Sequence, residues 1–108
     1  MGAAIVPPLI SIMKTKKFTL LQLFNVVDGR ISTSIDDVYA ILNHVFNTSV
    51  WTHQIPEYME RLKKASPLWF VVIEGELNTL KLIHGDEFKK LTKIIRDEMN
   101  IEFDIPQL

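Results

Sequence analysis

The sequence predicts an all-α fold, a compact bundle of about five short helices with an extended C-terminal tail. Apolar residues recur at helical spacing in five segments, and start and stop signals separate these segments. The chain has 108 residues, of which 47% are hydrophobic, which suffices for one core. We therefore expect a single helical domain over residues 14–100 and an extended tail over residues 101–108.

The composition limits the classes of function. With 12 Lys and Arg against 13 Asp and Glu, the chain lacks the basic surplus that binding to a nucleic-acid backbone needs. It has no cysteine, which excludes disulfides, thiol catalysis and thiolate zinc sites. No apolar stretch approaches the roughly 20 residues of a spanning helix. We expect no nucleic-acid partner and no membrane insertion.

Residues 1–13 stand apart from the predicted domain. They are largely apolar, contain the pair Pro7 and Pro8, and lack the basic start of a signal peptide. Met13 followed by Lys14 is typical of a natural cytosolic start. We expect a flexible or extended arm here, or an upstream extension over residues 1–12.

The first two helices have clear boundaries. Thr19 and Gln22 form a capping box for a helix from Leu20 to about Val27, and Gly29 lies just past its end. Ser34 caps the second helix, whose first turn holds two aspartates. The stripe of this helix consists of Ile35, Val38, Leu42 and Val45, and Asn47 with Thr48 should end it.

The next two helices meet at a Ser-Pro pair. Pro56 occupies a plausible first position of the third helix, and Ser66 and Pro67 stop it and cap the fourth. Residues 68–73, LWFVVI, are the hardest to assign, because six apolar residues in a row also fit a buried strand. We predict a helix, because a helix start precedes the run. A helix that is apolar all round belongs at the centre or in a subunit interface.

The C-terminal part contains a fifth helix and the tail. Asp86 is expected to cap a helix that carries Phe88, Leu91 and Met99 on its buried side. The tail alternates apolar and polar residues from Ile101, so its apolar face needs a partner surface on its own helices or on another subunit. Together with the apolar fourth helix, this indicates a homodimer or a higher homo-oligomer.

The turn between the first two helices is the first candidate site. A helix N-terminus receives anions readily, and Arg30, Ser32 and Thr33 would add donors, oriented by Asp28. The alternative is structural: Ser34 is a cap and Arg30 pairs with Asp28 or Asp36. Capping explains Gly29 and Ser34 but leaves Arg30, Ser32 and Thr33 without an evident structural role.

Thr52 and His53 form the second candidate, again just before a helix start. If the two helix starts converge, their polar tips form one pocket for an anionic ligand. The predicted ligand-binding residues are Arg30, Ser32, Thr33, Thr52, His53 and Asp28.

Catalytic and metal motifs are weak. His44, His53 and His84 share no ligand spacing, and no nucleophile elbow is present. We expect no metal, no cofactor and no enzyme activity, with a small hydrolase using His53 and Asp37 as the least favoured alternative.

Several short segments resemble a family of small uncharacterised proteins of tailed bacteriophages. They are Phe18-Thr19-Leu20, residues 27–33 (VDGRIST), Asp37-Val38-Tyr39, Ile41-Leu42-Asn43, residues 52–56 (THQIP) and Pro67-Leu68-Trp69-Phe70, within a similarity from about Phe18 to Phe88. The resemblance implies origin more than mechanism.

The resemblance implies an accessory protein in the host cytoplasm. We expect it to sequester a phosphorylated or nucleotide-like ligand, such as a host defence signal. The alternative is an inhibitor that binds a host protein through its apolar tail and aromatic surface.

Overall fold

The computed structural model describes residues 14–108, so the arm predicted over residues 1–13 lies outside the described part. The elements in chain order are β1 (Thr15–Thr19), α2 (Leu20–Val27), α3 (Ile35–Phe46), the 3-10 turn η2 (Thr52–Gln54), α4 (Ile55–Ala65), α5 (Leu68–His84), α6 (Phe88–Glu98) and β2 (Glu102–Pro106). The described chain is mostly helical, as predicted. It is not purely all-α, because β1 and β2 form a small sheet.

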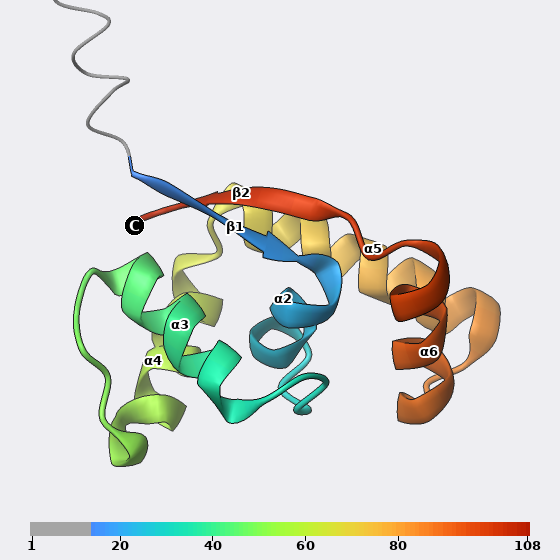
Figure 1. The fold of residues 1–108 in the computed structure, drawn as a ribbon, viewed down its shortest axis with the longest axis horizontal. Coiled ribbons are helices and arrows are strands. Elements are labelled where there is room, and N and C mark those ends of the chain that lie inside the picture. The colour runs from blue at the N-terminus through green and yellow to red at the C-terminus, as the bar shows by residue number, and fades with distance from the viewer. Residues whose placement is uncertain (1–13) are drawn as a thin grey trace, which may run out of the picture.

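The two strands pair in antiparallel fashion and join the ends of the described chain (Figure 1). Phe18 lies opposite Phe103, and Lys17 lies opposite Asp104 and pairs with it at 3.0 Å. The predicted tail is therefore extended, and it covers this chain's own helices, with Ile105 fully buried. The strand at Thr15–Thr19 was missed because its basic residues look like a solvated chain start.

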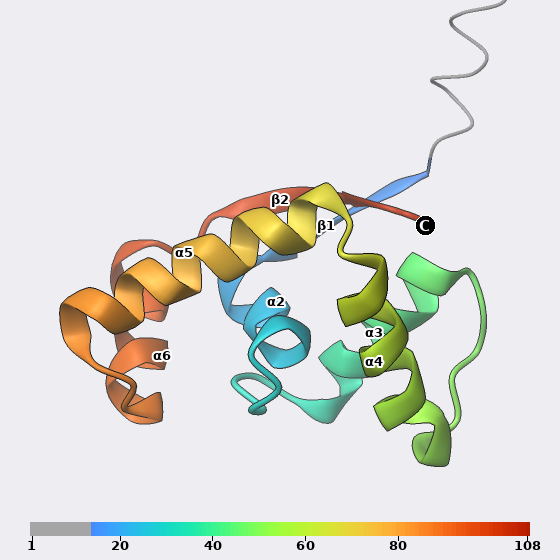
Figure 2. The same cartoon turned by 180° about the vertical axis from the view of Figure 1, so that it is seen from behind.

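Helix α2 lies at the centre of the fold. Figures 1 and 2 show α3 and α4 on one side of it, α6 on the other, and the sheet across one end, with α5 running along the back of Figure 1. Five of the eight α2 residues are buried apolar side chains, which surrounds this short helix with core. The buried members of the other helices are Val38, Ile41, Leu42, Val45, Leu62, Phe70, Ile73, Leu77, Leu80, Leu91 and Ile95.

The predicted helix boundaries around the polar turn are confirmed. The Thr19 hydroxyl accepts from the backbone N–H of Gln22, and the Gln22 side chain accepts from the Thr19 N–H. Gly29 has φ +95°, a left-handed conformation that favours glycine. Ser34 accepts from the backbone N–H of Asp37. These signals depend on neighbouring residues, so the sequence alone reveals them.

Residues 68–73 are helical, as predicted, but two predicted caps are wrong. Ser66 has φ +43° and ends α4, and α5 begins at Leu68 after Pro67. Asp86 does not cap α6, because its carboxylate pairs with Arg30 instead. None of the helices within residues 14–108 has both the length and the apolar character needed to cross a bilayer.

Candidate functional site

Four charged side chains form a cluster at the polar turn after α2. Two of them come from the turn, and the other two come from α5 and the loop that follows it. Arg30 donates from Nε and Nη2 to the two oxygens of Asp28, at 2.6 and 3.0 Å. Lys81, on α5, donates to Asp28 Oδ1 at 2.7 Å, and Arg30 Nη2 also reaches Asp86 Oδ1 at 2.5 Å. Two cations thus face two carboxylates. The cluster is neutral and leaves no surplus positive charge for an anion.

Burial and ion pairing shift the pKa of Asp28 in opposite directions. Its side chain is only 4% exposed, and this burial favours the neutral acid. The hydrogen bonds from Arg30 and Lys81 favour the carboxylate and outweigh burial, so the pKa of Asp28 lies below its ordinary value. The hydrogen bonds to Asp28 and Asp86 raise the pKa of Arg30 further above its already high ordinary value.

The fully buried Asn25 on α2 organises the rest of the turn. Its Oδ1 accepts from the backbone N–H groups of Ser32 and Thr33, at 2.8 and 3.3 Å. Its Nδ2 donates to the Thr33 hydroxyl at 2.7 Å. Thr33 in turn donates to Asp37, and the Ser32 hydroxyl donates to the backbone carbonyl of Leu21 at 2.6 Å. The hydroxyls of the turn therefore have structural roles.

The expectation that Arg30, Ser32 and Thr33 lack structural roles is therefore wrong. The structural alternative, in which Arg30 pairs with Asp28, describes the observed contact. Sequence reasoning missed Asn25, Lys81 and Asp86. A signal was available only for Asn25, which is a polar residue in an otherwise apolar helix face.

Thr52 and His53 lie apart from this cluster. Thr52 is hydrogen-bonded to Tyr39, whereas Thr33 is hydrogen-bonded to Asp37. Residues two apart in a helix point in nearly opposite directions, so the two threonines contact different sides of α3. The His53 ring lies beside that of Trp51 in a tilted arrangement, with ring centroids 6.4 Å apart. Figure 1 shows the turn and η2 at the same end of the molecule, with the start of α3 between them.

A cavity of about 220 Å³ lies between the end of α2 and the facing sides of α4 and α5. Its charged lining residues are Asp28, Glu60, Glu74 and Lys63, so acids predominate. None of the other five predicted ligand-binding residues lines it. The predicted convergence of the two polar tips on one pocket is thus not seen at this cavity.

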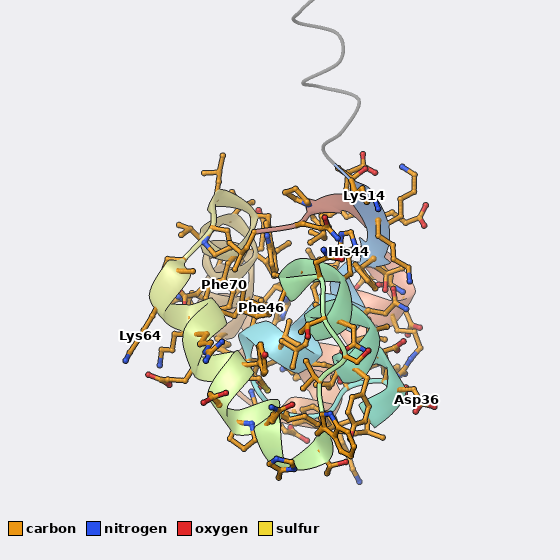
Figure 3. All side chains as sticks on the ribbon, turned by 90° about the vertical axis from the view of Figure 1, so that its left-hand side faces the viewer. Lys14, Asp36, His44, Phe46, Lys64 and Phe70 are labelled. Atoms are coloured by element: carbon orange, nitrogen blue, oxygen red, sulfur yellow. The ribbon has the colours of Figure 1, made fainter. Side chains whose placement is uncertain are left out.

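An apolar groove of about 350 Å³ separates the start of α5 from β2. Pro67, Leu68, Trp69 and Val72 line it on the helix side, and Phe103, Asp104 and Pro106 line it on the strand side. In Figure 3, which looks along the bundle, β2 lies between α5 and β1. The sequence named these aromatic and tail residues as an apolar surface, but their meeting in one groove depends on the sheet.

The indole nitrogen of Trp69 is unusual within residues 14–108. It is buried, yet it has no hydrogen-bond partner among the described groups. Buried donors are nearly always paired, so an isolated one needs an explanation. Trp69 is one of the residues that line the groove.

Within the same residues, no three His, Cys, Asp or Glu side chains gather closely enough to hold a metal ion. Comparison with curated proteins found no match. Comparison with solved structures found none either. A family described as a domain of unknown function, DUF7736, matches residues 18–73, which run from β1 into α5 and include the whole polar turn. This match spans more than half of the chain, and the chain belongs to this family.

Proposed function

We propose that the chain is a phage-encoded protein-binding module, which binds an apolar segment of a host protein in the groove between α5 and β2. The observation that carries this proposal is the groove itself, which exposes a mainly apolar lining. Its one charged lining residue, Asp104, is already paired with Lys17. The resemblance to small proteins of tailed bacteriophages supports a host partner and a place in the host cytoplasm.

The groove favours an extended segment with an available backbone carbonyl. Within the described chain β2 pairs only with β1, so its other edge, toward α5, has unpaired backbone groups. Extended peptides add to such edges, and apolar side chains then fill the neighbouring pocket. After a small rotation of the indole, Trp69 Nε1 would donate to a carbonyl of the bound segment. This hydrogen bond would give the unpaired donor a partner.

The polar turn supports ligand capture less well than the groove supports protein binding. The turn's guanidinium and its Ser32 and Thr33 hydroxyls already donate within the chain. An incoming phosphate would have to displace the buried Asp28 carboxylate and other acceptors within the chain, which costs the hydrogen bonds that hold the turn together.

Affinity capture from host lysate tests the proposal with matched variants. We expect the unmodified protein to retain one stoichiometric partner, and Leu68→Glu to lose it, because a carboxylate in an apolar groove is costly to bury. Leu68 is 81% exposed, so its substitution leaves the fold intact. Trp69→Phe keeps the ring and removes the N–H, and should weaken retention.

The control is Ile31→Glu, since Ile31 is an exposed apolar residue on the polar turn and does not line the groove. It should retain the partner fully. Equal retention of the same protein by all four forms of the chain would contradict the proposal, as would the absence of any stoichiometric partner. Deletion of residues 101–108 is unsuitable, because it removes the buried Ile105 and the strand pairing.

A further inference from the structure

Helix α5 has two apolar faces, and only one of them packs on the core. The inner face holds Phe70, Ile73, Leu77 and Leu80, all of them buried. The outer face holds Leu68, Val71, Val72, Gly75, Thr79, Leu82 and Ile83, at helical spacing and with no charge among them. Figure 2 shows α5 across the near side of the molecule, with no other described element in front of it.

Gly75 lies in the middle of the outer face, and nothing within the described chain accounts for it. A Cβ built at this position would meet no atom within 4 Å, and the residue does not have a positive φ. Glycine inside a helix weakens that helix, but it also allows another backbone to approach closely. The flanking large apolar side chains, which are exposed, give a second and independent reason to expect a partner here.

We propose that the outer face of α5 binds the same face of a second copy of this chain, in antiparallel orientation, with the helices crossing at Gly75 and Thr79. The stripe is symmetric about the midpoint between these two residues. Val71 and Val72 lie four and three residues before Gly75, and Leu82 and Ile83 lie three and four residues after Thr79. A two-fold axis through this midpoint therefore puts the valines of one copy against the larger side chains of the other.

The exposed area is adequate for such a dimer. Leu82 is 87% exposed and Ile83 67%, while Val71 and Val72 are about half exposed. Together with Leu68, these side chains leave roughly 600 Å² uncovered per copy, against about 800 Å² per partner in a standard stable interface. The backbone at Gly75 and the flanking residues supply the remainder.

Sedimentation equilibrium over a range of concentrations tests the dimer. We expect the unmodified chain to reach the mass of two chains, and Leu82→Glu to stay at the mass of one while it remains folded by circular dichroism. Ile31→Glu, the matched control on the polar turn, should still form the dimer. A single-chain mass for the unmodified protein at every concentration would overturn the proposal, and so would a dimer that survives Leu82→Glu.

Cysteine cross-linking tests the orientation, since the chain has no cysteine of its own. Val71→Cys and Leu82→Cys, mixed and oxidised, should form a linked pair, whereas neither variant should do so alone. In the antiparallel pair two copies of position 71 lie about 18 Å apart along the axis, well beyond the roughly 7 Å limit for a disulfide. Linkage within either separate sample, or no linkage in the mixture, would reject this arrangement.

The dimer face and the host-binding groove share Leu68 and Val72, so the two proposals are separated with variants at other positions. Leu82 is not among the residues that line the groove between α5 and β2. Leu82→Glu should therefore abolish the dimer and still retain the partner, while Trp69→Phe should weaken partner binding and keep the dimer. Each proposal can fail without the other.

Discussion

Arg30 Nη2 lies 2.5 Å from Asp86 Oδ1, although the two residues are 56 positions apart in the chain. This contact connects the turn after α2 with the loop between α5 and α6. The same guanidinium lies over the rings of Phe24 and Phe88, at 5.7 and 5.4 Å from their centroids. Arg30 thus contacts α2, the loop between α5 and α6, and α6 itself. Its removal should therefore lower the stability of the fold.

Arg30→Ala should lower the free energy of unfolding by about 2–3 kcal/mol, because it leaves the buried Asp28 carboxylate with Lys81 as its remaining cation. Urea denaturation measures the change. Arg61→Ala is the matched control, since Arg61 also pairs with a carboxylate and covers a ring, but on the surface. It should cost less than about 1 kcal/mol. Equal losses in the two variants would show that burial of the cluster contributes nothing.

The stability of the fold should fall in acid, because Asp28 becomes protonated there. Its pKa is lower in the folded state than the ordinary value of 3.8, so the unfolded chain binds the proton more readily. The stabilisation is complete above that ordinary value and is lost as the pH falls through the folded pKa. Urea midpoints measured between neutral pH and strong acid should decline less steeply for Asp28→Asn than for the unmodified chain. Parallel curves would contradict this assignment.

Asn25→Ala should destabilise the turn strongly. The buried amide serves two backbone N–H groups and one hydroxyl, which lose their partner together. We expect a loss of about 2–4 kcal/mol, and faster hydrogen exchange at the Ser32 and Thr33 amides. Ser32→Ala removes one hydrogen bond, to the Leu21 carbonyl, and should cost only about 1 kcal/mol. If exchange at these two amides is unchanged in Asn25→Ala, Asn25 does not organise the turn.

Substitution of a glycine by alanine should change stability in opposite directions at Gly75 and at Gly29. Gly75→Ala should raise the stability of the isolated chain by about 0.5–1 kcal/mol, because the new Cβ meets nothing and the helix gains propensity. Gly29→Ala should lower it by about 1 kcal/mol, because φ there is +95°. Thermal denaturation in dilute solution compares the two. A gain at both positions would mean that the turn does not require the left-handed conformation.

Calorimetry with cyclic dinucleotides and NAD-derived signals tests the small-ligand hypothesis. We expect no heat of binding, because Arg30, Ser32 and Thr33 donate within the chain and Thr52 and His53 contact other side chains. Saturable binding that Arg30→Ala abolishes would restore that hypothesis, provided that the variant remains folded by circular dichroism.

The sequence reveals most of the helices but less of the site. Thr19, Gln22, Gly29 and Ser34 have their predicted roles at helix ends, since each acts on backbone within about three residues. Ser66 ends α4, as predicted, but it does not cap α5, because its left-handed conformation serves the end of the preceding helix. Residues whose partners lie far away in the chain, such as Lys81 and Asp86, show no comparable local pattern in the sequence.

By itself, the sequence determined five helices, their main end signals and the apolar stripes that form the core, because these follow from local spacing and capping. The tertiary structure decided the rest. It paired Lys17 with Asp104, Arg30 with Asp86, and the start of α5 with the strand that forms the groove. Such partners are brought together only when distant segments pack, and no local rule of propensity encodes which of them will meet.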